Sequence, residues 1–387
     1  MTFAAGDIIL KIVHKEQSVT DLRVQKFAKI LVGHSARIAP GDRVLIEATT
    51  AAEPLVRELF IQILENGGHP HPLISFPGQE ESFLLHARDS QLEFVPTFMK
   101  LAYNQFESRI RIHSSTNTRG LSHIDPVKLQ KRNKATGMIT ETQMRRGAEG
   151  TFKWVTTLYP TNAYAQDAGM SLQEYEDFVF NAVHVNEEDP IAYWKSTAAE
   201  QQKAIDFLAN KDIVTLRGPN VDLSLSIKGR RFMNSTGVHN MPDGEIFTGP
   251  VEDSVNGWVR FTYPAIYGGV AVEGAELIFN RGRVEQAKAD KNEDYLIKML
   301  ESDSGSRYLG EFAIGTNFDI NRFTGNILFD EKIGGTFHMA LGAGYPETGS
   351  HNKSSIHWDM ICDLRTDSEI HVDGELFYKN GTFVFGK

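Results

Sequence analysis

Two residues with side chains suited to metal binding or acid–base chemistry stand close together near the C-terminus. In the segment SSIHWDM (354–360), His357 and Asp359 flank Trp358. Successive side chains of a β-strand point to opposite faces, so an imidazole and a carboxylate at this spacing share one face. Such a pair forms either a hydrogen-bonded surface pair or two ligands of one metal ion. The second interpretation requires partners from elsewhere in the chain.

Three other segments of the C-terminal half offer such partners. Glu245 lies in NMPDGEIFTGP between two turn signals, where a surface charge is the simpler interpretation. Glu311 lies in the otherwise apolar SRYLGEFAIGTN, where a buried carboxylate would need a partner. His338 lies among small and apolar residues in IGGTFHMALGAGYP, where a hydrogen-bonded core histidine is the simpler interpretation. No short regular motif such as H-E-x-x-H links these positions.

Taken together, these residues form a set that suits a metal centre with two ions. Oxygen and nitrogen ligands without thiolate favour Zn or Co, with Mn also suitable. Three carboxylates would offset three of the four positive charges of two divalent ions that share one carboxylate, and a bridging hydroxide would offset the last. The predicted metal ligands are Glu245, Glu311, His338, His357 and Asp359.

The composition limits the class of protein. The 387 residues, 41% of them hydrophobic, are enough for two domains with substantial cores. The formal net charge of −10 disfavours a nucleic-acid partner, because phosphate binding needs a basic face. Two short basic segments, QKRNK (130–134) and QMRRG (143–147), are interpreted as solvated helix faces.

Cysteine usage and the apolar runs indicate the compartment. The single cysteine, Cys362, excludes an internal disulfide and fits a cytoplasmic protein. It lies in the apolar run DMICDL, which favours a small core residue over a nucleophile. The N-terminal segment MTFAAGDIILKIVHKEQ has Asp7 before its short apolar run and no small-residue cleavage site after it, so we expect no signal peptide. No apolar run reaches the ~18 residues of a membrane span, and we expect no membrane partner.

The N-terminal half has the pattern of an α/β domain. RVLIEA (43–48) predicts a buried strand, residues 51–68 predict a helix that stops at Asn66-Gly67-Gly68, and HPHPLISF (69–76) predicts a second strand. This order indicates a parallel βαβ unit. The turn after the first strand has no glycine fingerprint, so we exclude a nucleotide site there. Further along, RIRIHS (109–114) alternates as an exposed strand does.

The C-terminal half has the pattern of an α+β domain with a large, mostly antiparallel sheet. VDLSLSI (221–227) alternates strictly, and Asp373-Gly374 and Asn380-Gly381 are hairpin signals. We therefore expect an α/β N-terminal domain over residues 1–195 and an α+β, metal-binding catalytic domain over residues 196–387.

Four ordered segments together resemble the thermophilic metallo-aminopeptidase family, that of aminopeptidases T and S and PepS. They are NMPDGEIFTGPVEDSVNG, SRYLGEFAIGTN, GGTFHMALGAGYPE and NKSSIHWDM. In the N-terminal half, TLYPTNAYAQDAGMSLQEYEDFVFNA and PGDRVLIEA are also similar to the family. The resemblance runs from about residue 20 to the end. Its departures are the short segment PETGSH (346–351) and the first twenty residues, which resemble an extension.

The resemblance implies an exopeptidase that uses two metal ions, usually Zn or Co, to remove N-terminal residues from peptides. It also implies a homodimer with an enclosed cavity. The five predicted ligands match the family's ligand positions one by one, and Tyr345 matches its active-site tyrosine. In this role Tyr345 would donate a hydrogen bond to the developing oxyanion. Glu311 is the candidate acceptor of the proton that water loses, besides its role as ligand. Glu245 or Asp359 would bind the free amine of the peptide substrate.

Two other functions fit the same residues. A two-metal hydrolase of another amide or an ester would act on substrates that lack a free amino terminus. A metal-binding protein on the same fold would bind the ions without turnover. The intact set of ligands together with Tyr345 favours an enzyme.

Overall fold

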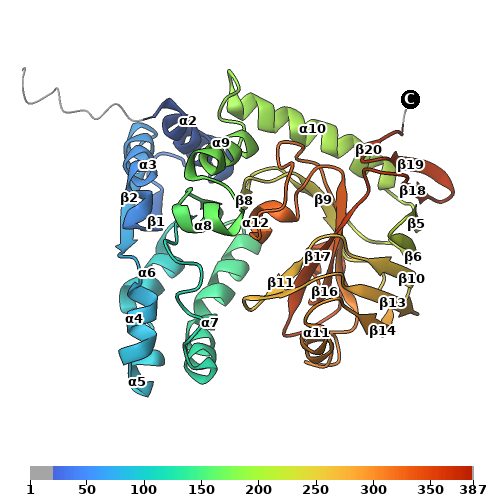
Figure 1. Cartoon of the computed structure of the whole chain (residues 1–387). Helices are drawn as coiled ribbons and strands as arrows, with labels where there is room; N and C mark the ends of the chain where they lie inside the picture. The colour runs from blue at the N-terminus through green and yellow to red at the C-terminus, as the bar shows by residue number, and fades with distance from the viewer. Residues whose placement is uncertain (1–20, 386–387) are drawn as a thin grey trace, which may run out of the picture.

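The N-terminal part of the chain builds a parallel β-sheet with helices packed around it (Figure 1). In this computed structural model, which describes residues 21–385, the strand order β2-β1-β3-β4 is parallel throughout. The first twenty residues, which we predicted to be an extension without a signal peptide, lie outside that range. The strands are β1 (Arg43–Thr49), β2 (His69–Ser75), β3 (Ser108–His113) and β4 (Lys153–Leu158). The helices are α2 (Leu22–Ile30), α3 (Glu53–Glu65), α4 (Gln79–His86), α5 (Asp89–Leu92), α6 (Thr97–Gln105), α7 (Pro126–Ala148), α8 (Asn162–Asp167) and α9 (Leu172–Ala182).

Local signals in the sequence explain where these elements begin and end. β1, α3 and β2 form the predicted βαβ unit, in which β1 and β2 pair in parallel from Arg43 opposite His69 to Thr49 opposite Ser75. Helix α3 ends before Gly67, whose positive φ of 77° suits glycine at this position.

One prediction for this sheet is wrong, because β3 is a central strand and not an exposed one. β3 lies between β1 and β4, and most of its residues are buried. Arg109 is buried because its guanidinium donates to Gln143 Oε1 and Thr156 Oγ1, each at 2.9 Å. The arginines of this strand alternate with apolar residues, which is the pattern of an exposed strand. Arg109 can nevertheless be buried because its guanidinium group is hydrogen-bonded.

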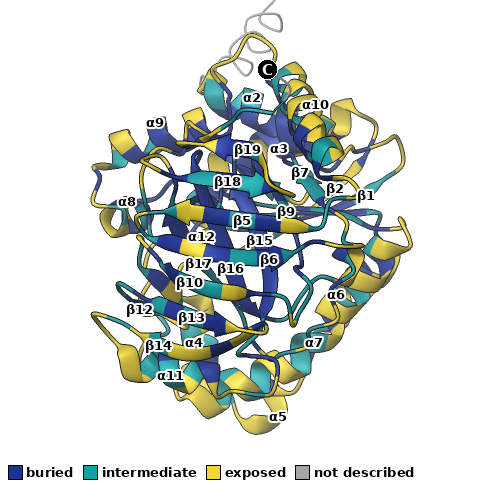
Figure 2. Ribbon diagram, turned by 90° about the vertical axis from the view of Figure 1, so that its right-hand side faces the viewer, coloured by how far each residue is buried: buried dark blue, intermediate teal, exposed yellow. Residues whose placement is uncertain are grey.

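The C-terminal part contains two antiparallel sheets that share one core. The larger has the order β14-β13-β10-β6-β5-β18-β19-β20 and the smaller has the order β17-β16-β15-β9-β7. Figure 2 looks onto the larger sheet, with β15, β16 and β17 behind it. The larger sheet consists of β5 (Ile213–Gly218), β6 (Val221–Ser226), β10 (Asn256–Arg260), β13 (Glu276–Asn280), β14 (Arg283–Lys288), β18 (Glu369–Val372), β19 (Glu375–Lys379) and β20 (Thr382–Phe383). The smaller sheet consists of β7 (Met233–Ser235), β9 (Glu245–Thr248), β15 (Leu309–Gly315), β16 (Thr336–Gly342) and β17 (His357–Asp363).

The core between these sheets takes alternate side chains from each strand. Leu216 and Leu223 of the larger sheet belong to the same buried cluster as Phe312, Phe337 and Trp358 of the smaller sheet. Because side chains alternate, the residues between these positions in β15, β16 and β17 point to the opposite face of the smaller sheet. Cys362 is buried in this core, as predicted. The remaining elements here are the hairpin β11 (Ala265–Tyr267) with β12 (Val270–Val272), and the helices α11 (Glu293–Leu300) and α12 (Ile327–Asp330).

Helix α10 (Pro190–Leu208) and strand β8 (Asn240–Met241) are among the elements that join the N-terminal and C-terminal parts, which also share a buried cluster that includes Tyr175, Phe178 and Phe329. Helix α10 runs along the top of the molecule in Figure 1 and contains the expected boundary between residues 195 and 196. Strand β8 belongs by sequence to the C-terminal half, yet it pairs in parallel with β4. The N-terminal sheet is therefore completed by a strand from beyond that boundary.

The predicted fold class and both hairpins are confirmed. Asp373-Gly374 connects β18 to β19 and Asn380-Gly381 connects β19 to β20, and all four residues have positive φ as a two-residue turn of type I′ requires. Ser171 and Glu174 form a reciprocal capping box at the start of α9. Among residues 21–385, the helices are too short or too polar to cross a bilayer.

Candidate metal centre

The five predicted ligands come together on one face of the smaller sheet. Glu245 begins β9, Glu311 lies on β15, His338 lies on β16, and His357 and Asp359 lie on β17. β9, β15, β16 and β17 are consecutive neighbours in this sheet. Since the alternate residues fill the core, all five side chains extend from the face opposite the larger sheet.

Small residues stand opposite these side chains in the strand ladders. Glu245 pairs with Gly315 and His357 pairs with Gly342. The other pairings put Ala313 opposite His338, and Ala340 opposite both Glu311 and Asp359. The glycines let the carbonyl groups of Ile333 and Ile356 pack closely on the sheet, and the short side chains of Ala313 and Ala340 leave space for the imidazoles and carboxylates.

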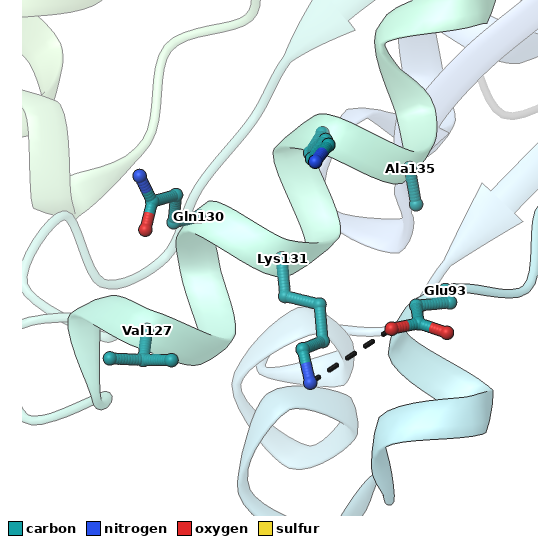
Figure 3. Close-up of a pocket in the computed structure, with 6 residues that line it drawn as sticks. Glu93, Val127, Gln130, Lys131 and Ala135 are labelled. Atoms are coloured by element: carbon teal, nitrogen blue, oxygen red, sulfur yellow. Dashed lines mark ion pairs between the residues drawn. The ribbon is translucent and has the colours of Figure 1, made fainter.

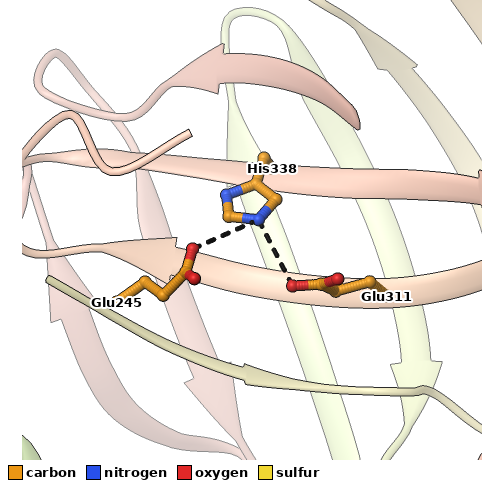
Figure 4. A group of neighbouring side chains, drawn as sticks. All are labelled: Glu245, Glu311 and His338. Carbon is orange, nitrogen blue, oxygen red and sulfur yellow. Dashed lines mark ion pairs between the residues drawn. The ribbon is translucent and has the colours of Figure 1, made fainter. Parts of the chain in front are cut away.

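Glu245, Glu311 and His338 form a buried group (Figure 4). Nε2 of His338 lies 3.5 Å from Oε2 of Glu245 and 3.4 Å from Oε1 of Glu311. The three ligand atoms that these residues offer lie within 4.8 Å of one another. All three residues are buried, with 5% or less of each residue exposed.

A second group adjoins the first and is closer to solvent. Oε2 of Glu311 lies 3.3 Å from Nε2 of His357, which lies 3.5 Å from Oδ1 of Asp359. His357 and Asp359 keep 27% and 12% of their side chains exposed, so the centre is reached from their side. Nδ1 of His357 donates to the carbonyl oxygen of Ala343 at 2.7 Å. This bond orients the ring so that Nε2 faces the carboxylates, as in many metal-binding histidines.

Glu331, which sequence reasoning missed, forms a third group with His338 and Asp359. It follows α12 on the loop that precedes β16, outside the strands that position the other residues. In the sequence it stands within FDEKIGG beside another acid and a lysine, which is the pattern of a solvated surface. No periodic signal distinguishes it, and only the spatial proximity to His338 identifies it.

Excess negative charge dominates the electrostatics of the cluster. Burial on its own would lower the pKa of His338, but the carboxylates of Glu311 and Glu245 raise it to about 9. Burial also opposes protonation of His357, yet Asp359 and Glu311 raise its pKa to about 12. Burial raises the pKa of Glu245 to about 8. A cluster that favours the cationic form of two imidazoles also favours bound metal cations.

The hydrogen bonding of the cluster fits a metal centre. Among the described residues, Oε2 of Glu245, Nδ1 of His338 and Oδ1 of Asp359 are buried polar atoms without a hydrogen-bond partner. Buried polar atoms without a partner destabilise a fold unless another group binds them. The two carboxylate oxygens face imidazole Nε2 atoms at 3.5 Å, and metal ions bound between these atoms would satisfy them.

Tyr345 lies beside the more exposed group. Its ring centre is 5.2 Å from that of His357 and 5.5 Å from that of Phe247. Burial, together with the negative charges of Glu311 and Asp359, raises the pKa of the phenol above its usual range. Tyr345 therefore remains a hydrogen-bond donor next to the accessible side of the cluster.

The basic segment 130–134 lies elsewhere, on α7, beside a pocket lined by residues of α7 and Glu93 (Figure 3). Lys131 pairs with Asp89 at 2.8 Å and lies 3.9 Å from Glu93. Arg132 donates to the carbonyl oxygens of Leu92 and Phe94. These contacts attach α7 to the neighbouring helix α5, so this basic segment takes part in packing within the N-terminal domain.

Comparisons with known proteins agree with this architecture. A family model described as thermophilic metalloprotease (M29) matches residues 20–383. Aminopeptidase 2 from Geobacillus stearothermophilus is 28% identical over 379 residues, which cover 90% of each chain. The structure of wild-type AmpT from Thermus thermophilus matches with a TM-score of 0.82 and 23% identity, over 94% of this chain and 99% of that one. A 2,5-dihydroxypyridine dioxygenase from Pseudomonas putida KT2440 matches with a TM-score of 0.56 and 12% identity, over 94% and 97% of the chains.

The chain belongs to the thermophilic metalloprotease family M29. This confirms the resemblance seen in the sequence and places the chain among metal-dependent hydrolases of peptide bonds. Since a dioxygenase shares the overall fold, the fold alone does not define the reaction. The residues of the candidate metal centre must therefore support the functional argument.

Proposed function

We propose that the protein is an aminopeptidase that uses two divalent metal ions to hydrolyse the first peptide bond of peptides with a free N-terminus. The observation that carries this proposal is the arrangement of the ligand groups. Glu311 belongs to two of them, with one oxygen toward His338 and the other toward His357. One carboxylate between two groups is the arrangement that a bridged pair of ions requires.

The charges of the centre support two ions. Glu331 adds a fourth carboxylate to the three that the sequence predicted, and these four charges match those of two divalent cations, while Asp243 offsets the charge of the neighbouring Lys332. Oxygen and nitrogen donors without thiolate favour Zn or Co, with Mn as a further candidate. When bound, such ions supply Lewis acidity, which brings the pKa of water to about 7 and polarises the scissile carbonyl.

The protein's own residues supply the remaining functions. The peptide approaches from the side of His357 and Asp359, where the cluster is partly exposed. Tyr345, beside His357, donates a hydrogen bond to the oxygen that becomes negative in the transition state. Glu311 would hold both ions, and its second role, as acceptor of the proton that water loses, stays a prediction. Glu245 or Asp359 would bind the free amine of the substrate.

We further propose that the protein acts as a homodimer, as the family resemblance implies, and that it is cytoplasmic, as its single cysteine indicates. Analytical ultracentrifugation at micromolar concentration tests this assembly. A fully active monomer would contradict the dimer without affecting the assignment of the metal centre.

The function is tested by metal analysis combined with a panel of peptides. We expect two Zn or Co ions per chain and cleavage of peptides with a free amino terminus, while matched N-acetylated peptides remain intact. Equal hydrolysis of acetylated peptides or esters would support the more general amide or ester hydrolase. Two bound ions without turnover on any substrate would support the non-catalytic metal-binding protein.

A further inference from the structure

A lysine without measurable exposure lies against the candidate metal centre. The side chain of Lys332 is 0% exposed, and its Nζ lies 3.2 Å from Oε1 of Glu245 and 3.8 Å from Oδ1 of Asp243. It also pairs with Oε1 of Glu331. Burying an ammonium group is costly unless the group is paired, and these carboxylates provide the pairing.

The ammonium group and the imidazole of His338 contact different oxygens of Glu245. Lys332 donates to Oε1, while Oε2 faces Nε2 of His338 at 3.5 Å and has no hydrogen-bond partner among the described residues. Lys332 therefore lies behind the carboxylate, on the side away from the imidazole. It leaves one oxygen of Glu245 directed into the cluster.

The backbone fixes Lys332 in this place. Its carbonyl oxygen accepts from the amide of Asn317 at 3.1 Å, and its amide donates to the carbonyl oxygen of Phe329 at 3.0 Å. A Cβ added at Gly315, which pairs with Glu245, would lie 2.3 Å from the carbonyl oxygen of Ile333. The loop that carries Lys332 thus packs directly on the strand beside Glu245, with little freedom to withdraw.

We propose that Lys332 is a positioning residue that holds one oxygen of Glu245 and one of Glu331 away from the metal ions. Each glutamate then binds metal through a single oxygen. This inference rests on the two-metal function proposed above.

The physical reason concerns the number of available donor atoms. Each of the four carboxylates carries two oxygens, and each of the two imidazoles brings one nitrogen. If every oxygen bound metal, the ions would be saturated by protein. A catalytic metal site needs an open position for water or substrate. By occupying two oxygens, Lys332 keeps positions open for the peptide.

The test separates this positioning role from the charge of Lys332. The double variant Asp243→Asn/Lys332→Met removes one negative and one positive charge, so the net charge of the centre is unchanged. Asp243 belongs to none of the ligand groups. Lys203→Met, which removes an exposed lysine on α10, serves as the matched control. Circular dichroism and thermal unfolding of the metal-free proteins establish that each variant folds.

The readouts are Co²⁺ stoichiometry by calorimetry, the visible absorption spectrum of the Co²⁺-loaded protein, and turnover. We expect the double variant to bind two ions, with weaker absorption bands that indicate higher coordination numbers. Turnover at saturating metal should fall ~10–100-fold, the usual effect of losing a residue that orients a metal ligand. An unchanged spectrum with normal turnover, or loss of one ion by the folded variant, would overturn the proposal.

The single variant Lys332→Met provides an independent measurement. Removing a cation beside the centre should strengthen binding of the second ion by roughly tenfold or more, since like charges a few ångströms apart repel by more than 1.4 kcal/mol even at an effective dielectric of ~20. Weaker binding would show that Lys332 is needed to assemble the ligands and would contradict our inference. If the unmodified protein itself binds fewer than two ions, the two-metal function is wrong. The Co²⁺ absorption spectra of the unmodified protein and the double variant then still test whether Lys332 limits the number of carboxylate oxygens that bind metal.

Discussion

Oε2 of Glu311 lies 3.3 Å from Nε2 of His357, and its other oxygen, Oε1, lies 3.4 Å from Nε2 of His338. This places Glu311 between the first two of the three ligand groups of the candidate centre. The relationship distinguishes Glu311 from Glu245, which belongs to one group only.

Glu311→Ala should therefore lower the metal content more than Glu245→Ala does. Loss of the shared carboxylate weakens both positions, whereas loss of Glu245 weakens the buried position alone. Metal content after dialysis against a weak chelator, measured by mass spectrometry on both variants, checks this. Equal losses would contradict the bridging role.

Substitutions of His338 and Tyr345 should have different consequences. His338→Ala removes a ligand, so metal content and activity should fall together. Tyr345→Phe should keep the metal and lose roughly 10²–10³-fold in turnover, the usual effect of removing one oxyanion donor. KM should change much less, because the hydrogen bond forms mainly in the transition state. The measurement is metal stoichiometry beside steady-state kinetics. If Tyr345→Phe loses metal or keeps normal turnover, its assigned role is wrong.

Glu331→Gln should weaken metal binding although the residue lies outside the sheet. Glutamine keeps the size of the side chain but removes the charge that contributes to the third group. Glu301→Gln, on a side chain that is 63% exposed, is a matched control. Titration with Zn²⁺ should show weaker binding only for Glu331→Gln. Identical titrations would remove Glu331 from the ligand set.

Removing the metal should abolish activity and leave the fold largely intact. The hydrophobic core between the two C-terminal sheets is independent of the ligand face, so chelated protein should keep its circular dichroism spectrum. Added Zn or Co should restore turnover. Full activity of protein shown by mass spectrometry to be metal-free would disprove the proposed function.

Helix α10 offers a test of stability away from the centre. The side chain of Asp189 caps this helix by accepting from the amides of Ile191 and Ala192, each at 3.1 Å. Asp189→Ala should lower the free energy of unfolding by ~1 kcal/mol. The exposed Glu200→Ala on the same helix should change it by less than ~0.5 kcal/mol. Urea unfolding of both variants measures the difference, and metal content should be unaffected in each.

Regular patterns account for what could be predicted from the sequence. The spacing of His357 and Asp359 predicted one strand face because the period of a strand is fixed, and β17 confirms it. The same argument failed for β3, where the buried Arg109 belongs to a hydrogen-bonded network that no local pattern reveals. Glu331 was missed for a related reason, since it enters the centre from a loop. Periodicity predicts the face to which a side chain points, and partners distant in sequence decide whether a charged residue is buried there.

Strand β8 has a consequence for how the two halves of the molecule can move or be separated. Met241 is part of the N-terminal hydrophobic core, and only four residues later Glu245 contributes to the metal centre. A fragment of residues 196–387 would expose Met241 and leave β8 without its partner strand, and a fragment of residues 1–195 would lack the strand that completes its sheet. Any rotation of the N-terminal sheet would pull on the backbone that holds Glu245. The position of Glu245 therefore depends on how Met241 packs in the N-terminal core.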